Sequence, residues 1–356
     1  MTPQSTAEPE TPAEPETPGE PEAPAEPEAP AEPETPAEID GRSWRLAVRR
    51  ALRAFGIDEC PDIAASLTFY AILALVPAVM VSFSIVSLLG RRDETARIVA
   101  DVTTALMPDI SDDAVHDAIT RIADARLSGI LLVFALALTA WAVARYVAAL
   151  GRGMNRIYGV PEGRPAWRLK AGQLLIAVVV IICTALILAI LTFTDAVAET
   201  LGESFGIGDV TLLVWRILRW PLLAAIVVFV LAFLYYFSPN VKPSHFRWMS
   251  LGAAAAVVVL VLASLGFWLY VANVADYDRL YGAFAGVIIF VLWLWIANMA
   301  ILVGAEFDAE VERVRQLQAG VPAEIQVQVP LRDARRIAQG VRRDREEEAD
   351  ARRIRR

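Results

Sequence analysis

Long apolar stretches separated by short polar ones dominate the chain after its first forty residues. Six of these stretches contain at most two charged side chains each, and they cover about 63–89, 127–150, 171–194, 213–237, 249–273 and 281–305. A helix of roughly 20 apolar residues crosses the ~30 Å hydrocarbon core of a bilayer. The stretches lack the alternation of barrel strands, and a lone strand cannot satisfy its backbone in lipid. The pattern predicts an all-α integral membrane protein with a bundle of six transmembrane helices.

The charges between the apolar stretches differ in sign from one side of the predicted bundle to the other. Arginine and lysine predominate in 41–55, in 151–170 and after the last stretch, whereas 195–211 holds four acids and no cation. Cytoplasmic segments of membrane proteins carry the excess of cations. We therefore expect a multi-pass protein with both termini in the cytoplasm.

The first forty residues have a composition of their own. Residues 8–37 are five consecutive hexads of the type EPETPA, and residues 1–38 hold eleven Glu with no Lys or Arg. Proline at every third position and repelling carboxylates prevent a packed core. The whole chain has a formal net charge of −8, so the rest of the chain is mildly basic. We expect a disordered acidic, Pro-rich tail over 1–40, either as a spacer or as a solubilising extension.

Two further segments flank the predicted membrane domain, which covers 41–310. Residues 43–55 place Trp44, Val48, Leu52 and Phe55 on one helical stripe, with arginines over the remainder. Such a basic amphipathic helix lies on an anionic membrane surface or packs on the cytoplasmic face of the bundle. Residues 311–356 predict a charged, Arg-rich cytoplasmic tail. Anionic lipid headgroups are the expected partners of these basic segments.

Three charged residues stand at or near the cytoplasmic ends of apolar stretches. They are Asp62 before the first, Arg145 in the second and Glu306 after the last. Charged groups at membrane depth are costly and usually face a bundle interior or a wet cavity. The three residues could form one functional cluster. They could instead be separate side chains that reach the interface independently.

A second polar group is expected on the outer side, in the turn between the last two stretches. Asn273, Tyr277 and Asp278 crowd this turn, either as a headgroup or solute site or as part of an aromatic interface belt. Gly282 and Gly286 form a GxxxG pattern that could bring the last helix close to a neighbour.

Motifs for enzymatic chemistry are missing. The sequence has no P-loop, no GxSxG and no CxxC, and its two histidines, His116 and His245, are predicted on opposite sides of the membrane. A metal site of several histidines cannot be built from them. We expect no catalytic residues, no metal and no cofactor, and the basic loops need no nucleic acid to explain them.

Four stretches resemble the YihY/BrkB family of bacterial inner-membrane proteins, once described as ribonuclease BN. They are DIAASLTFYAILALVPAVM (62–80), GRGMNRIYGV (151–160), YYFSPNVKPSHFRWMSLGA (235–253) and YVANVADYDRLYGAFAGVIIFVLWLWIANMAILVGAEFDAE (270–310). The resemblance covers about residues 45–310. It implies six helices in the inner membrane, both termini in the cytoplasm and a role in envelope integrity.

The sequence leaves three functions to be compared. The first is transport or flipping of a lipid-like or amphipathic solute, without ATP because no nucleotide motif is present. The second is a membrane scaffold that transports nothing. The third, a membrane ribonuclease, is disfavoured by the histidine count. Substrate, direction, energy coupling and oligomeric state are left open by the sequence.

Overall fold

The computed structural model describes residues 39–88, 128–192, 208–242, 246–273 and 284–355, and this part of the chain is almost entirely helical. Its helices are α1 (Gly41–Ile57), α2 (Cys60–Leu88), α5 (Ser128–Ile157), α6 (Ala166–Thr192), α8 (Gly208–Phe237), α9 (Phe246–Asn273), α11 (Ala285–Gln318) and α12 (Arg335–Ile354). In these ranges β-type pairing is limited to one isolated bridge, between Val241 and Leu331. The acidic tail expected over 1–40 lies outside the described residues except for its last two.

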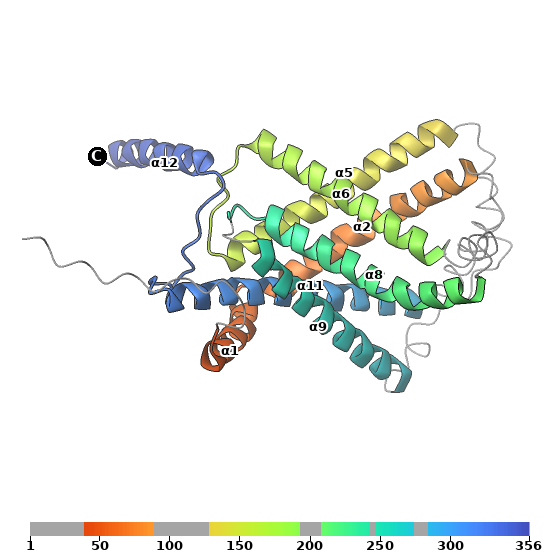
Figure 1. The fold of residues 1–356 in the computed structure, drawn as a ribbon. Helices are drawn as coiled ribbons and strands as arrows, with labels where there is room; N and C mark the ends of the chain where they lie inside the picture. The colour runs from red at the N-terminus through yellow and green to blue at the C-terminus, as the bar shows by residue number, and fades with distance from the viewer. Residues whose placement is uncertain (1–38, 89–127, 193–207, 243–245, 274–283, 356) are drawn as a thin grey trace, which may run out of the picture.

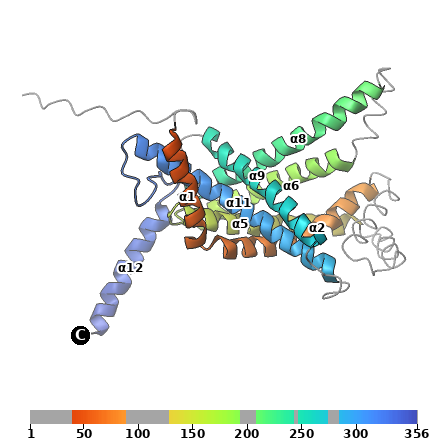
Figure 2. The same cartoon turned by 90° about the horizontal axis from the view of Figure 1, so that it is seen from below.

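The long helices form one bundle, and the shorter ones gather at one of its ends (Figures 1 and 2). The most extensive contacts join α9 with α11 and α2 with α5. α1 packs against α11 at the end of the bundle from which α12 projects. The first and last helices therefore lie at the same end.

Five helices are long and apolar enough to cross a membrane within the described ranges. They are Val133–Ile157, Ala166–Ile187, Ile217–Phe237, Leu251–Asn273 and Ala285–Gln318. α2 adds a shorter apolar stretch over Cys60–Leu75. Proline is accommodated inside α2 at Pro77 and inside α8 at Pro221, as membrane helices allow. The predicted all-α membrane class is thus confirmed, with five membrane-length helices.

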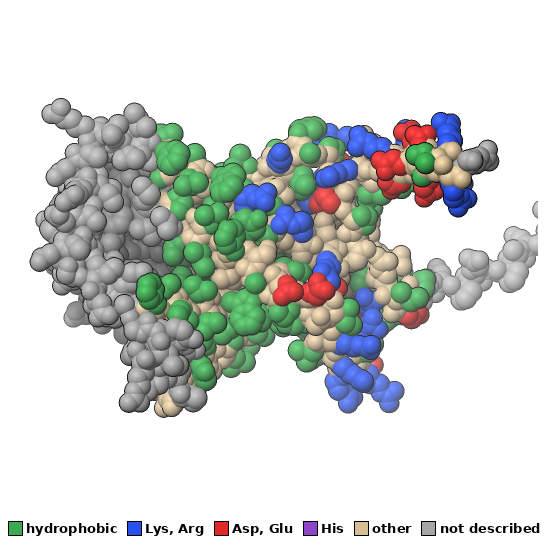
Figure 3. All heavy atoms as spheres, turned by 180° about the vertical axis from the view of Figure 1, so that it is seen from behind, with side chains coloured by type: hydrophobic (Ala, Val, Ile, Leu, Met, Phe, Trp, Pro, Cys, Tyr) green, Lys and Arg blue, Asp and Glu red, His purple; other side chains and the backbone are tan. Residues whose placement is uncertain are grey.

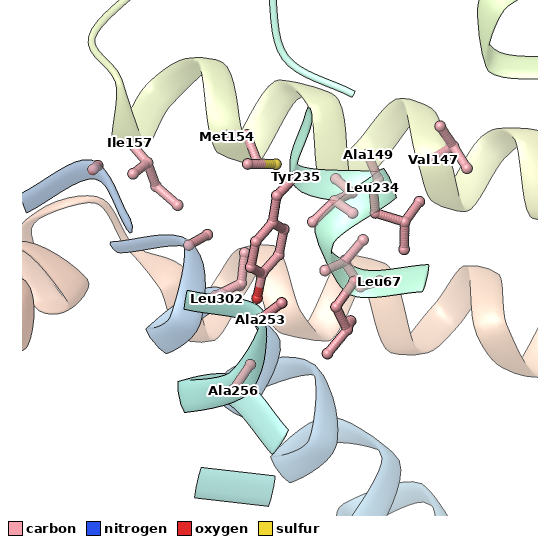
Figure 4. Packing of buried hydrophobic residues seen from close by; sticks show 14 of the residues in the cluster. Leu67, Val147, Ala149, Met154, Ile157, Leu234, Tyr235, Ala253, Ala256 and Leu302 are labelled. Atoms are coloured by element: carbon pink, nitrogen blue, oxygen red, sulfur yellow. The ribbon is translucent and has the colours of Figure 1, made fainter. Parts of the chain in front are cut away.

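The core lies where α2, α5, α8, α9 and α11 meet (Figure 4). Tyr235 of α8 is fully buried there, among Leu67, Met154 and Leu302. Its hydroxyl donates a hydrogen bond to the carbonyl of Ile301, which satisfies the polar end of an otherwise apolar side chain. Away from this centre, large apolar side chains face outward over much of the bundle surface (Figure 3), as lipid-facing helices require.

α1 begins at a cap and ends beside the first apolar helix. The carboxylate of Asp40 accepts a hydrogen bond from the Ser43 amide at 2.7 Å, which satisfies a free amide of the first turn. Hydrogen bonding by the Ser43 side chain, followed by this bond from its amide, lowers the pKa of Asp40 below its usual value. Ala47 and Ala51 are buried on the side towards α11, whereas Leu52 and Ile57 are exposed. The helix therefore packs on the bundle and still presents an apolar surface outward.

The last apolar helix continues beyond the expected end at 305, because its polar continuation is also buried. Val311 and Val314 pack with Ile39 and Ala47, and the guanidinium of Arg313 binds the carboxylate of Glu310 at 3.0 Å. The chain from 319 to 333 then lies against the loops at this end, where the amide of Lys242 donates to the carbonyl of Pro330. Residues 311–333 are thus part of the folded structure, and within the tail expected over 311–356 only α12 has no buried residue.

Candidate functional site

A buried carboxyl group marks the end of the bundle at which α1 lies. Glu306 of α11 is 1% exposed, and the thiol of Cys60, the first residue of α2, donates to its Oε1 at 3.4 Å. Asp58, in the turn before α2, interacts with the same carboxyl group. Glu306, Cys60 and Asp58 thus form one polar group at this end of the bundle.

The turn between α1 and α2 holds Asp58 in a partly buried position. Burial raises the pKa of Asp58, although its hydrogen bond with Glu306 and the nearby Arg156 oppose this shift. Arg156 lies 3.9 Å from Asp58 and 2.8 Å from Glu59. Arg156 therefore connects the turn between α1 and α2 to the end of α5.

A second polar group lies inside the bundle and joins three membrane helices. The hydroxyl of Tyr146 on α5 donates to Oδ1 of Asn298 on α11 at 2.8 Å. The amide nitrogen of Asn298 donates to the hydroxyl of Thr68 on α2 at 3.1 Å, and Thr68 donates to the carbonyl of Ala64 at 2.8 Å. Asn298 and Glu306 are eight residues apart on α11, so about 12 Å of helix separates the two polar groups.

The third polar group lies on the surface of the same helices. Arg145 is exposed, and its guanidinium donates to the hydroxyl of Tyr70 at 3.1 Å and lies 5.4 Å from the centre of the Tyr70 ring. Asp62 is also exposed, in the first turn of α2. Across the described residues its side chain has no hydrogen bond or ion pair, since only its backbone amide bonds, to the carbonyl of Glu59 at 3.0 Å.

The structure therefore gives the three predicted inner residues different partners. Glu306 is buried with Cys60 and Asp58, Arg145 is exposed against Tyr70, and Asp62 stands at the surface. α5 continues to Ile157 rather than ending near 150, so Arg145 lies about 18 Å of helix from the end of α5, farther than the sequence indicated.

Only part of the predicted outer group falls within the described residues. Asn273 is exposed at the end of α9 and donates to the carbonyl of Leu269 at 2.8 Å, one turn back on its own helix. Gly286 lies in the first turn of α11 and is half-buried. Tyr277, Asp278 and Gly282 lie outside the described residues, as do both histidines.

Sequence reasoning missed a buried contact between α9 and α11. Asp308 is 5% exposed, and its Oδ1 accepts a hydrogen bond from the Gly252 amide at 2.8 Å. The stretch 235–253 contains Gly252, but nothing in its pattern indicates that a carboxylate from residue 308 approaches it. The available signal was the run of acids at every second position from Glu306 to Glu312 directly after an apolar stretch.

A second missed group ties the loops at the same end together. Asn240 accepts from the amide of Asp333 at 3.2 Å and donates to the carbonyls of Pro161 and Asp333. Its own amide donates to Oδ1 of Asn155 at 2.7 Å, and Asn155 donates to Glu162 at 3.1 Å. Burial opposes ionisation of Glu162, but hydrogen bonds from Arg164 and the other neighbours outweigh it and lower the pKa of Glu162.

Metal ligands do not gather in the described ranges: no three His, Cys, Asp or Glu side chains there come together as a metal site would require. What the geometry offers is a buried glutamate beside a cysteine and an aspartate, an interhelical hydrogen-bond network and a surface arginine. These features, inside long apolar helices, define a helical integral membrane protein with polar groups at membrane depth.

The chain belongs to the family described as Virulence factor BrkB, whose model matches residues 51–326. It is 26% identical over 266 residues to the ribonuclease-like protein YfkH of Bacillus subtilis, covering 74% of this chain and 94% of the relative. A UPF0761 membrane protein of Rhodospirillum centenum is 33% identical over 74% of this chain and 56% of its own length. One from Azoarcus is 28% identical, over 76% and 64%.

The chain thus spans a little over half the length of the UPF0761 relatives that it matches. The relatives support the membrane assignment, since the UPF0761 proteins are named as membrane proteins. No solved structure matches the chain.

Proposed function

We propose that this protein is a plasma-membrane protein with six transmembrane helices and cytoplasmic termini, which moves a lipid-like or amphipathic solute across the bilayer. α2 would be the sixth span, beside the five membrane-length helices. The basic segments around α1 and after α5 would face the cytoplasm. The end of the bundle that carries α1 and α12 would then be the inner one.

The observation that carries the proposal is the hydrogen-bonded series of Tyr146, Asn298 and Thr68 within the membrane helices. Polar groups in hydrocarbon are costly and often line the route of a polar substrate. The series lies on α2, α5 and α11, and α2 and α11 also carry Cys60 and Glu306. A polar headgroup could exchange hydrogen bonds with these groups while acyl chains remain in lipid.

Transport can be tested with purified protein in phospholipid vesicles. A fluorescent phospholipid placed in one leaflet should reach the other faster with the protein than without it. N298L and E306Q should each reduce this rate several-fold, because each removes a group that a headgroup or proton could use. G266A, at a position in α9 with nothing within 4 Å, is the control. A rate equal to that of empty vesicles would contradict the proposal.

A scaffold is the second candidate, and α12 favours it. This helix of 20 residues has no buried residue and is rich in arginine and acids, so it is free to bind a partner. Removing residues 341–356 leaves the folded part intact and should abolish the cellular phenotype of a scaffold. A transporter would keep its vesicle activity after the same truncation.

A further inference from the structure

One side of α5 carries arginines that the protein itself does not neutralise. Arg145 lies within the membrane-length segment Val133–Ile157 and is exposed. Arg152 follows seven residues later, which is two helical turns and about 10 Å along the same face. It is also exposed. The guanidinium of Arg145 donates to the hydroxyl of Tyr70 on α2, and Arg152 lies on the same face of α5 towards its end.

Two other arginines, one on α5 and one in the segment after it, have carboxylate partners. Arg156 pairs with Glu59 at 2.8 Å, and Arg164 pairs with Glu162 at 2.8 Å. Within the described part of the chain, no carboxylate lies within ion-pair distance of Arg145 or Arg152. Arg145 and Arg152 are thus left for an anion from outside.

The surroundings determine which anion can reach them. Figure 3 shows cationic side chains interrupting an otherwise hydrophobic surface. Exposed apolar side chains lie near Tyr70 and Arg145 along α2 and α5. Among them are Phe69, which is 62% exposed, and Trp141, which is 52% exposed. The contact with Tyr70 holds the guanidinium of Arg145 at the level of that ring, instead of extended towards the cytoplasmic end. An anion there must arrive with an apolar body.

We propose that Arg145, Arg152 and Tyr70 bind the phosphate group of a membrane phospholipid that enters from the lipid phase between α2 and α5. A guanidinium offers a planar pair of donors that matches phosphate oxygens. The Tyr70 hydroxyl, once released from Arg145, adds a third donor. The apolar side chains around them would cover the first part of the acyl chains.

This inference rests on the membrane placement in the proposed function, but not on transport. Binding can be measured without movement of lipid. Absence of lipid transfer in vesicles would therefore remove the proposed function and leave the phosphate site standing. Loss of phospholipid binding with unchanged lipid transfer would instead remove the phosphate site and leave the proposed function standing.

The test uses the full chain in detergent and native mass spectrometry with three probes. Phosphatidylglycerol is the expected ligand, diacylglycerol with the same acyl chains lacks the phosphate, and inorganic phosphate lacks the chains. R145Q and R152Q each keep hydrogen-bond donors but remove the charge. Each should weaken phosphatidylglycerol binding about tenfold, the loss expected for one charge-assisted hydrogen bond.

R168Q is the matched control. Arg168 also lies over an aromatic ring, 5.1 Å from the centre of Trp167, but it has a carboxylate 3.7 Å away in Asp333. It should bind phosphatidylglycerol as the unaltered protein does. Y70F keeps the ring and removes only the hydroxyl, so a smaller loss is expected. If R145Q does not fold, R152Q alone tests the proposal.

Three results would overturn the proposal. The first is equal phosphatidylglycerol binding by R145Q, R152Q and the unaltered protein. The second is binding of diacylglycerol as strong as that of phosphatidylglycerol, which would make the phosphate irrelevant. The third is displacement of the lipid by inorganic phosphate at equal concentration, which would indicate a site for a water-soluble anion.

Discussion

Gly304 of α11 lies against Gly252 of α9 so closely that a Cβ at Gly304 would be 2.5 Å from the Gly252 carbonyl oxygen. The backbones of the two helices therefore touch at this crossing. The contact also brings the Gly252 amide within reach of Asp308. Small residues that allow such an approach are typical of packed membrane helices.

The first prediction concerns this crossing. G252A should lower the Tm of the detergent-purified protein, because overpacking a tight contact costs about 1–3 kcal/mol. G266A, on the same helix, should leave Tm unchanged or raise it, since nothing lies within 4 Å of that position and alanine favours helix. Equal Tm values for G252A and the unaltered protein would show that the helices do not touch there.

The second prediction concerns the polar network in the bundle. N298A should cost about 1 kcal/mol, because interhelical hydrogen bonds in membranes are of this size. A double-mutant cycle with Y146F should show coupling of about 0.5–2 kcal/mol, since the two side chains share a bond of 2.8 Å. The same cycle between Asn298 and Ser264, whose hydroxyl accepts instead from Trp293, should show no coupling.

The third prediction concerns pH. The pKa of Asp58 is raised in the folded protein by burial. Its charged form is thus disfavoured by folding, and its contribution to stability is present at low pH and lost as the pH rises through the raised value. D58N should flatten the dependence of Tm on pH between the usual value of 3.8 and neutrality. D344N, on α12, should leave that dependence unchanged.

The fourth prediction concerns the chain after α11. Truncation after Gly340 should leave Tm unchanged, because α12 has no buried residue. Truncation after Pro330 should lower it, because Arg332 donates to Tyr236 and the amide of Asp333 donates to Asn240. Leaving buried partners unsatisfied costs about 1–3 kcal/mol for each group. Similar Tm values for the two truncations would contradict the packing of 331–333.

The fifth prediction concerns the loops at the same end. N240A should lower Tm by the loss of bonds to Pro161 and Asp333, about 1–3 kcal/mol in buried surroundings. Q326A is the control, because Gln326 is exposed although it donates to Gly159 at 2.7 Å. Thermal unfolding followed by intrinsic tryptophan fluorescence measures both variants.

The predicted helices correspond to the observed ones because their signal is local. A run of apolar residues of membrane length favours helix wherever it lies, so 171–194 and 249–273 match α6 and α9 within a few residues. The ends were harder to predict. α5 and α11 continue past their apolar stretches, since residues such as Met154 and Val311 are buried by neighbouring segments.

The candidate sites were predictable only as residue types. Asp62, Arg145 and Glu306 stand out because charge near an apolar stretch is costly. The sequence could not show that Glu306 is bonded to Cys60, or that Arg145 lies on Tyr70. These partners come from helices more than 70 residues away in the chain.

By itself the sequence determined the class of the protein, its helical composition and its membrane-length apolar segments, because hydrophobic length and charge act residue by residue. Tertiary structure alone decided which polar groups meet, where α11 ends and which arginines on α5 lack a carboxylate. Those outcomes depend on how the helices cross, and the crossings are set by contacts such as that between Gly252 and Gly304.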